Sequence, residues 1–281
     1  MNLIKDILVN IRAAYRFLLF TIVILVYLLV GAFYYVVTVN PILRRRRLID
    51  NARLFSNVMR KTFNMDVVCK NPIPKDENSL VVGNHIGFID IVALQAVSSC
   101  VFITSKEMQK TPGLGQICDL AGCTYVDRKN RMNIQDELKG VIQVLKDGSR
   151  VVLYAESVAS NGEQVLPFKK TLLMAAGFAD RPIRPFVFNF RKVNGGPVLF
   201  EHRDSLCWYG DENFVFAIWR SLKLNSIQVE IEFLPLVYTK PEDDRSVIAK
   251  RLHDMVSENY VPFRPGMNTH HTGRENKCIE L

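Results

Sequence analysis

A histidine and an aspartate separated by four residues are the side chains of this chain best suited to chemistry. His85 and Asp90 lie in the segment LVVGNHIGFID, which spans residues 80–90. The apolar run at 80–82 predicts a short buried strand, and the Gly-Asn pair after it ends that strand. The apolar positions that follow Gly87 predict a helix with wide apolar coverage. The pattern therefore places an imidazole at a strand-to-helix turn and a carboxylate in the first turn of the helix.

This pair of side chains predicts a general base. A carboxylate near a histidine accepts a hydrogen bond from one ring nitrogen, fixes the tautomer and leaves the other nitrogen free. No serine or cysteine near His85 occupies a recognisable nucleophile context, so the pair favours a base that activates a substrate hydroxyl over a covalent intermediate. The alternative is a helix N-terminus that polar residues merely cap.

Three further charged side chains come at or just after the ends of predicted strands, namely Lys106, Arg128 and Glu156. Because strand ends in α/β sheets meet at the crevice where ligands bind, these side chains are expected to converge with His85. Lys106 and Arg128 are suited to holding a phosphate, the arginine through its bidentate fork. Glu156 is suited to accepting hydrogen bonds from a polyol. The alternative for each is a surface charge or an ion pair.

The N-terminal segment predicts a membrane anchor. No charged residue stands between Phe17 and Thr38. A helix over 17–38 would be roughly 33 Å long, enough to cross a hydrocarbon core of about 30 Å. A cleaved signal peptide is disfavoured because the apolar run is too long and no small-residue cleavage site follows it. The segment predicts a transmembrane helix, with shallow burial in one leaflet as the alternative.

Basic residues follow this segment. Arg44–Arg47 stand directly after it, and the chain of 281 residues carries a net charge of +8. The positive-inside bias places the body on the cytoplasmic face, and the arginines are expected to contact anionic headgroups. No nucleic-acid-binding motif accompanies them. The six cysteines form no Cys-x-x-Cys pair, which agrees with a reducing compartment.

The periodicity of the chain predicts its organisation. Residues 1–64 are expected to form a membrane-anchoring helix pair, whose second helix, at 44–64, is amphipathic. Residues 65–262 predict a single α/β domain with a central, mostly buried β-sheet flanked by helices. A polar tail at 263–281 is predicted to be disordered. The predicted strands are 79–83, 100–104, 122–126, 150–155, 184–190, 196–201 and 227–234, and the predicted helices of the body are 88–98, 113–120, 131–147, 168–178, 211–223 and 243–259.

Taken in order, these segments resemble the glycerolipid acyltransferase family, whose best-known members are the 1-acylglycerol-3-phosphate acyltransferases. The resemblance covers about residues 79 to 235. Four blocks carry it: Asn84-His85 with Asp90; Lys106-Glu107 with Pro112-Gly-Leu-Gly115; Gly122-Cys-Thr-Tyr-Val-Asp-Arg128; and Glu156 followed by Pro185.

The resemblance implies a role for each matching residue. His85 would be the general base and Asp90 its orienting partner, so that the acceptor hydroxyl attacks the thioester of acyl-CoA or acyl carrier protein directly. Arg128, helped by Lys106, would bind the acceptor phosphate. Two further roles are implied: Glu156 would contact the glycerol portion, and Pro185 would shape the acyl-binding side. The resemblance implies no cofactor and no metal.

One block departs from the family pattern. The family usually has Glu-Gly-Thr where this chain has Glu156-Ser157-Val158. Losing the glycine restricts the backbone, and Ser157 joins the residues expected to bind the acceptor. The continuation, Ser-Asn-Gly and then Leu-Pro-Phe-Lys, resembles members that act on lysophospholipids or lyso-aminolipids. The leading acceptor is 1-acylglycerol-3-phosphate, which would give phosphatidic acid. The alternatives are a lysophospholipid or lyso-ornithine lipid, and, from another class, an inactive member that only binds lipid.

Overall fold

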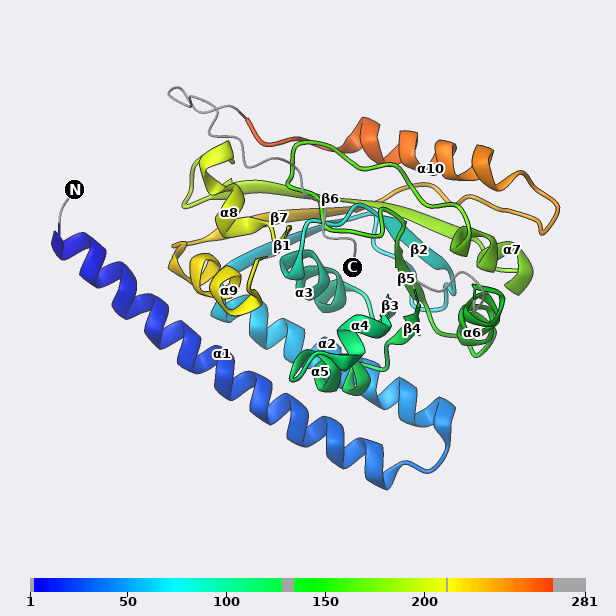
Figure 1. Cartoon of the computed structure of the whole chain (residues 1–281), viewed down its shortest axis with the longest axis horizontal. Coiled ribbons are helices and arrows are strands. Elements are labelled where there is room, and N and C mark those ends of the chain that lie inside the picture. The colour runs from blue at the N-terminus through cyan, green and yellow to red at the C-terminus, as the bar shows by residue number, and fades with distance from the viewer. Residues whose placement is uncertain (1–2, 128–133, 211, 265–281) are drawn as a thin grey trace.

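The computed structural model describes residues 3–127, 134–210 and 212–264 (Figure 1). Its centre is a seven-stranded sheet in the order β1-β7-β6-β2-β5-β3-β4. Strands β6, β2, β5, β3 and β4 run parallel to one another, whereas β7 and β1 run the opposite way. The strands are β1 (Met65–Lys70), β2 (Leu80–Gly83), β3 (Val101–Ser105), β4 (Thr124–Val126), β5 (Val151–Tyr154), β6 (Ile183–Val193) and β7 (Ile227–Phe233).

Helices cover both faces of this sheet. Figure 1 shows α10 above the sheet and α3 below it, followed outward by α2 and then α1, with α7 and α6 at the right-hand end. The predicted single α/β domain with a central, mostly buried sheet flanked by helices is confirmed, and the sheet is mostly parallel. The helices are α1 (Leu3–Val37), α2 (Pro41–Thr62), α3 (Phe88–Val97), α4 (Lys106–Lys110), α5 (Leu114–Leu120), α6 (Ile134–Lys146), α7 (Ala175–Ala179), α8 (Arg203–Leu206), α9 (Phe214–Lys223) and α10 (Arg245–Asn259).

The two central strands are buried along their whole length. Every residue of β2 and of β5 is buried. Such continuous apolar runs are typical of parallel strands that helices cover on both faces. The two strands pair in parallel, and their register places Gly83 beside Tyr154. The carboxyl ends of β2 and β5 therefore meet at one edge of the sheet.

The first two helices form an antiparallel pair. The chain reverses at Asn40, whose side chain accepts hydrogen bonds from the backbone N–H groups of Ile42 and Leu43 and caps α2. The amphipathic stripe predicted for α2 is confirmed, because Leu48, Ala52 and Met59 are buried. The pair lies along the body rather than standing away from it (Figure 1).

Helix α1 is longer than the predicted transmembrane segment and packs on the body through one face. It contains 35 residues and, among the described residues, is the single helix long and apolar enough to cross a membrane. Its inner face is buried at Ala13, Tyr27 and Gly31. Its outer face is apolar and open, with Leu18 57% and Leu29 71% exposed.

Two predicted elements of the body differ in the structure. Residues 196–201 were expected to be a strand, but they follow a turn at Asn194 and Gly195, whose φ angles are 54° and 81°. Pro197 cannot donate to a ladder, so the segment forms isolated bridges and a short 3-10 turn, η3 (Phe200–His202). The strand prediction there is wrong.

The helix predicted at 168–178 is also shorter than expected. The Lys169 N–H donates to the Ala155 carbonyl at 2.7 Å and keeps the chain extended there. Helical structure begins only at η2 (Leu172–Met174) and continues in α7.

Strand β1, in contrast, forms where the sequence predicts no element. Residues 265–281 of the predicted tail lie outside the described residues, and the chain is still packed at Phe263, which is 4% exposed.

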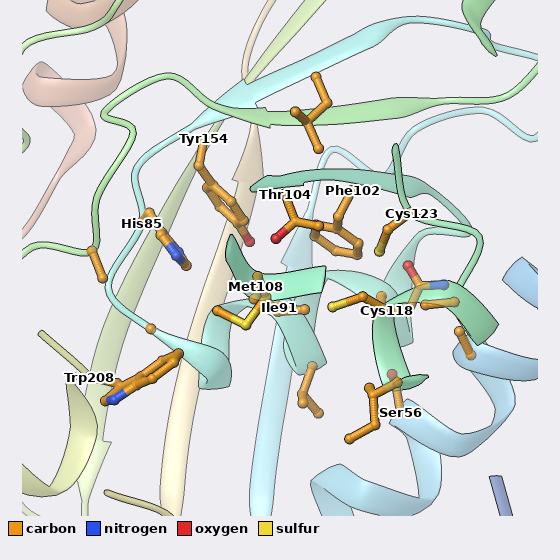
Figure 2. Close-up of a pocket in the computed structure, with 18 of the residues that line it drawn as sticks. Ser56, His85, Ile91, Phe102, Thr104, Met108, Cys118, Cys123, Tyr154 and Trp208 are labelled. Carbon is orange, nitrogen blue, oxygen red and sulfur yellow. The ribbon is translucent and has the colours of Figure 1, made fainter. Parts of the chain in front are cut away.

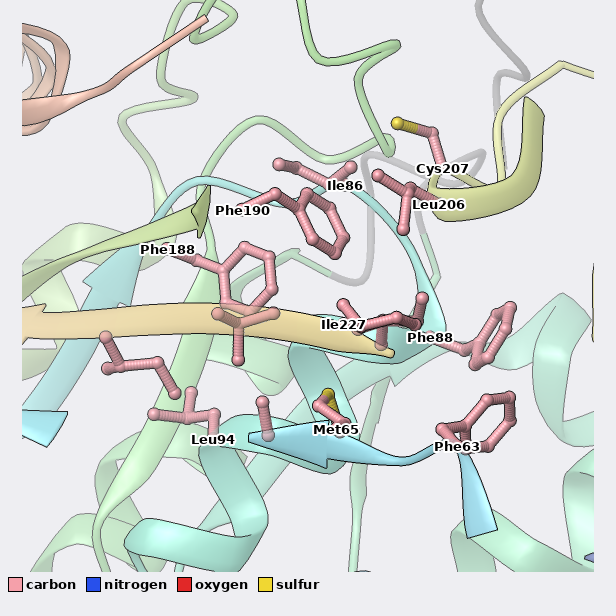
Figure 3. Packing of buried hydrophobic residues seen from close by; sticks show 14 of the residues in the cluster. Phe63, Met65, Ile86, Phe88, Leu94, Phe188, Phe190, Leu206, Cys207 and Ile227 are labelled. Carbon is pink, nitrogen blue, oxygen red and sulfur yellow. The ribbon is translucent and has the colours of Figure 1, made fainter. Parts of the chain in front are cut away.

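A cluster of aromatic side chains anchors the turn after β2. Figure 3 shows Ile86 beside Phe190, Leu206 and Cys207, with Phe88 next to Phe63. Ile86 is 1% and Phe88 8% exposed. Each buried side chain of this size contributes about 1.5–3 kcal/mol. The residues that flank His85 and precede Asp90 therefore hold the turn against the core.

Candidate active site

The turn that carries His85 begins at a close approach of two strands. A Cβ atom at Gly83 would come within 2.5 Å of the Phe186 carbonyl oxygen, so a larger residue does not fit there. The Asn84 side chain makes two hydrogen bonds to the neighbouring strand β6. Its Nδ2 donates to the Phe188 carbonyl at 3.0 Å, and its Oδ1 accepts from the Phe188 N–H at 2.8 Å. These bonds hold the backbone so that the next residue, His85, lies beyond the end of β2.

His85 and Asp90 lie in direct contact. The Nδ1 atom of His85 is 3.0 Å from Oδ2 of Asp90, and the two side chains are 19% and 0% exposed. Oδ2 also accepts from the backbone N–H groups of Ile86 at 2.6 Å and Gly87 at 3.0 Å. An ionised carboxylate only accepts, so Nδ1 of the neutral imidazole carries the hydrogen and Nε2 holds the free lone pair.

Tyr154 completes this network, and the sequence alone did not point to it. Its hydroxyl donates to Oδ1 of Asp90 at 3.0 Å, and its ring stacks on the His85 imidazole with centroids 4.1 Å apart. Burial, and then the neighbouring Asp90 charge, raise the pKa of the Tyr154 hydroxyl well above its usual range. Tyr154 therefore stays protonated and acts as a donor that fixes both members of the pair.

An apolar cavity of about 240 Å³ opens beside His85. Figure 2 shows His85 and Trp208 on one side of it and Cys118 and Cys123 on the other, with Phe102, Ile91 and Met108 between. Helices α1 and α2 close it on its far side, where they contribute Tyr27 and Phe55 among others. The cavity is apolar and has an imidazole on its wall. It is suited to an aliphatic chain whose reactive end lies at His85.

The Trp208 segment, which the sequence did not indicate, lies against the His85 turn. The Trp208 N–H donates to the Ile86 carbonyl at 3.0 Å. A Cβ atom at Gly87 would come within 2.8 Å of the Trp208 nitrogen, so only glycine permits this approach. The motif glycine between His85 and Asp90 thus has a packing role that its place in the sequence did not reveal.

Glu156 lies beneath the His85 turn rather than on the cavity wall. Its side chain is 2% exposed, and its Oε1 accepts from the His85 backbone N–H at 3.2 Å. Among the described residues, its Oε2 has no hydrogen-bond partner. Burial raises the pKa of the Glu156 carboxyl well above its usual range, although the backbone N–H groups of His85 and Leu166 oppose this. The predicted contact with the acceptor stays a prediction.

Ser157 lies on the cavity wall and has a left-handed backbone, with φ at 67°. Lys106 begins α4 at the end of β3, and its ammonium is 3.8 Å from an Asp127 carboxylate oxygen. Pro185 is buried within β6, beside Val82 of β2, and does not line the cavity. Arg128 lies outside the described residues. The structure thus brings His85, Asp90 and Ser157 to one site and places Glu156 directly behind it.

The arginines after the N-terminal segment contact the protein. Arg45 pairs with Asp147 at 3.4 Å, Arg47 donates to the Thr38 hydroxyl at 2.9 Å, and Arg44 lies 4.4 Å from the centre of the Tyr35 ring. Arg44 and Arg47 thus join α2 to the end of α1, and Arg45 joins α2 to the residue that follows α6. Headgroup binding by the same arginines stays a prediction.

Comparison with known proteins places this site in a family. Residues 64–189, which contain β1 to most of β6, match the Acyltransferase family. A lyso-ornithine lipid O-acyltransferase from Brucella abortus is 30% identical over 184 residues, which cover 63% of this chain and 69% of that protein. A 1-acyl-sn-glycerol-3-phosphate acyltransferase from Neisseria gonorrhoeae is 25% identical over 186 residues, or 66% of this chain and 71% of that protein.

A solved structure shares the fold. The crystal structure of the 1-acyl-sn-glycerophosphate acyltransferase PlsC from Thermotoga maritima superposes with a TM-score of 0.66. The two chains are 20% identical, and the match covers 91% of this chain and 96% of the other. The superposition therefore extends over most of both chains.

Proposed function

The chain belongs to the glycerolipid acyltransferase family, and on that premise we propose that it moves a fatty acyl group from an acyl thioester to the free hydroxyl of 1-acylglycerol-3-phosphate. The observation that carries this proposal is the His85–Asp90 pair beside an apolar cavity. A base next to an apolar cavity is the arrangement that acylation of a hydroxyl requires. The product of this reaction is phosphatidic acid.

The proposed reaction begins with proton transfer to His85. Nε2 of His85 takes the proton of the acceptor hydroxyl as its oxygen attacks the thioester carbonyl carbon. The tetrahedral intermediate then collapses, the carbon–sulfur bond breaks, and the imidazolium gives its proton to the departing thiolate. Asp90 stays ionised throughout and stabilises the imidazolium. Tyr154 holds Asp90 and the imidazole plane in place while the charge develops.

The cavity is proposed to bind the acyl chain of the donor, which is acyl-CoA or acyl carrier protein. Its walls come from the sheet on one side and from α1 and α2 on the other. An aliphatic chain buried there gains about 25 cal/mol per Å² of apolar surface removed from water. This binding would place the thioester carbonyl at His85, and it gives α1 and α2 a role beyond attachment.

The acceptor phosphate is assigned to Lys106 and Arg128. Lys106 projects from the carboxyl end of β3, beside Asp127 at the end of β4. Arg128 follows Asp127 directly in the sequence. An arginine fork and an ammonium together favour a terminal phosphomonoester.

A second acceptor class has its own support. Ser157 stands where the family usually has glycine, and the lyso-ornithine lipid O-acyltransferase named above is 30% identical to this chain. Both observations favour an acceptor with a larger, zwitterionic headgroup, such as a lysophospholipid or a lyso-ornithine lipid. The reaction at the hydroxyl would be the same.

The membrane is the proposed location, with the body on the cytoplasmic face. One face of α1 is packed on the body from Ala13 to Gly31, and its opposite face is apolar and open. A helix held along the body in this way lies in the plane of one leaflet more readily than it crosses the bilayer. The proposal therefore replaces the transmembrane helix expected over 17–38 with an in-plane helix.

One assay tests these proposals together. Purified protein in detergent is incubated with a labelled acyl thioester and a panel of lysolipids, and kcat/KM is measured for each acceptor. We expect 1-acylglycerol-3-phosphate to be preferred, and we expect Arg128→Ala to lower its kcat/KM about 100-fold, as for the loss of a bidentate charged contact. Arg128→Lys should not restore it, because an ammonium lacks the planar fork.

The same assay separates the alternatives. A wild-type preference for a zwitterionic lysolipid, with no effect of Arg128→Ala on either acceptor, would contradict the phosphate assignment and support the second class. Lipid binding without acyl transfer to any acceptor would support an inactive member. The intact His85–Asp90–Tyr154 network argues against that outcome, since an inactive chain has no use for it.

A further inference from the structure

Helix α9 presents an open apolar face close to α1. Val215 is 52% and Phe216 66% exposed. Residues three and four positions apart share one face of a helix, so Phe216, Trp219 and Lys223 lie in one row. The opposite face of α9 is packed into the core through Ala217, Ile218 and Leu222. The exposed aromatic residue is therefore not needed for packing within the chain.

A contact between aromatic rings and two hydrogen bonds join α9 to α1. The Trp219 ring meets the Phe17 ring edge-to-face, with centroids 6.0 Å apart. The guanidinium of Arg12 donates to the Lys223 carbonyl at 2.6 Å, and that of Arg16 donates to the Leu224 carbonyl at 2.5 Å. These contacts fix α9 to α1, so α9 stays beside α1 when a bilayer receives the outer face of that helix.

We propose that α9 is a second bilayer-contacting element, which inserts Phe216 and Val215 at the lipid interface beside α1. This inference rests on the in-plane placement of α1 proposed above. The composition of the row fits the assignment, because the Lys223 ammonium lies 5.6 Å from the centre of the Trp219 ring. Tryptophan and lysine at the edge of an apolar face are typical of the headgroup region of a membrane.

The position of α9 gives the contact a consequence for the substrate. The Phe214 ring, in the first turn of α9, lies 4.9 Å from the Trp208 ring. Trp208 lines the cavity on the side of His85 (Figure 2). A bilayer that contacts α9 is therefore next to the reactive end of the cavity. A lysolipid acceptor would leave the leaflet at this edge and reach His85 without crossing water.

Fluorescence quenching tests the contact directly. Single-tryptophan reporters are made in the full chain after Trp208 and Trp219 are replaced by phenylalanine. The test reporter is Phe216→Trp. The matched control is Val247→Trp on α10, a position that is 64% exposed, against 66% for Phe216, on the opposite side of the sheet (Figure 1). The reference reporter on the outer face of α1 is Leu18→Trp.

Each reporter is mixed with phosphatidylcholine–phosphatidylglycerol vesicles whose acyl chains carry bromine, a short-range quencher. We expect quenching at position 216 comparable to that at position 18, and no quenching at position 247. Quenching at 18 without quenching at 216 overturns the α9 proposal and leaves the in-plane helix α1 intact. An absence of quenching at 18 contradicts the membrane placement of α1 itself. Quenching at all three positions indicates unspecific adsorption and also overturns the α9 proposal.

Vesicle partitioning gives a second test that keeps both native tryptophans. Phe216→Ser should lower the vesicle partition coefficient about fivefold, as expected for an aromatic side chain that is partly buried in the interface. Val247→Ser should leave it unchanged. Circular dichroism and thermal unfolding confirm that both variants are folded. Equal partitioning of Phe216→Ser and wild type would contradict the proposal.

Discussion

The loop that carries His85 and the loop that carries Glu156 leave neighbouring strands, yet their polar groups are satisfied to different degrees. In the first loop, the side chain of Asn84 and the carboxylate of Asp90 make hydrogen bonds through both of their polar ends. In the second, Glu156 Oε2 is buried without a hydrogen-bond partner among the described residues, and Ser157 has a positive φ.

This difference links the proposed reaction to the first loop and specificity for the acceptor to the second. A fully satisfied polar network is rigid, and rigidity is what a positioned base requires. A loop with a strained backbone has departed from its best local geometry and persists only because its surroundings hold it. We infer that the first loop carries the proposed chemistry, whereas the second, with Ser157 in place of the usual glycine, is where this chain departs from the family pattern.

The largest effect is expected from removing the base of the first loop. His85→Ala should lower kcat about 10²–10⁴-fold, which is the usual contribution of a positioned general base. Thermal unfolding should change little, because the imidazole is at the cavity wall and partly exposed. His253→Ala on α10 is the matched control, since it removes a histidine far from the cavity. Retention of more than about a tenth of wild-type turnover by His85→Ala would show the mechanism to be wrong.

Tyr154→Phe should have the next largest effect. It removes the hydroxyl that donates to Asp90 and keeps the ring that stacks on His85. A lost hydrogen bond to a buried charge corresponds to about 1.5 kcal/mol, or roughly a tenfold lower kcat. KM for the acyl donor should stay nearly unchanged, because the shape of the cavity is retained.

Comparison of kcat with stability distinguishes positioning from simple destabilisation. Tyr154→Phe should lower kcat about tenfold at temperatures well below its thermal unfolding transition, where the variant is folded. Tyr125→Phe is the control, because the Tyr125 hydroxyl makes the same type of bond to Asp119 at 2.6 Å outside the cavity. An unchanged kcat in Tyr154→Phe would leave this residue with a packing role alone.

Glu156→Gln should alter the pH dependence of stability. The folded state raises the pKa of Glu156 above its ordinary value of 4.5 through burial. Its contribution to stability is therefore complete below that value and is lost as pH rises through the folded pKa. An amide keeps an acceptor for the His85 N–H and never ionises.

The free energy of unfolding of Glu156→Gln, relative to wild type, should rise as the pH increases above 4.5. Denaturant titrations at several pH values measure it. Glu156→Ala, which removes the acceptor as well, should be destabilised throughout. A Gln variant that follows the wild-type pH dependence would mean that Glu156 is ionised in the folded protein.

The smallest effect is expected from Ser157→Gly, which restores the family residue in the second loop. Glycine adopts a φ of 67° without strain, so the free energy of unfolding should increase by about 1 kcal/mol. Denaturant titration of this variant and of Ser160→Gly, a buried serine of the same loop, gives the comparison. If Ser157→Gly also changes the preference between acceptors, the serine contributes to specificity as well as to strain.

The sequence anticipated much of the fold because its signals are local. Apolar runs predicted β2, β3, β5 and β7, and helical periodicity predicted α2, α3 and α10. The errors arose where local pattern and pairing disagree. Residues 196–201 are apolar enough for a strand, but Pro197 and the turn before it prevent pairing. Strand β1 forms because it pairs with β7 at the edge of the sheet. No pattern within 65–70 reveals this pairing.

The sequence by itself determined the contact between His85 and Asp90, on which the proposed chemistry depends, because the two residues lie within one turn and their spacing brings them together. Only the tertiary structure decided what holds that pair. Tyr154 reaches Asp90 because β2 and β5 are paired in a register that sets Gly83 beside Tyr154. Glu156 lies beneath the His85 backbone for the same reason. The two faces of α1 were likewise indistinguishable in the sequence, since both are apolar, and contact with the body made one of them inner and left the other open. Contacts between segments distant in sequence depend on pairing and packing, which local periodicity does not encode.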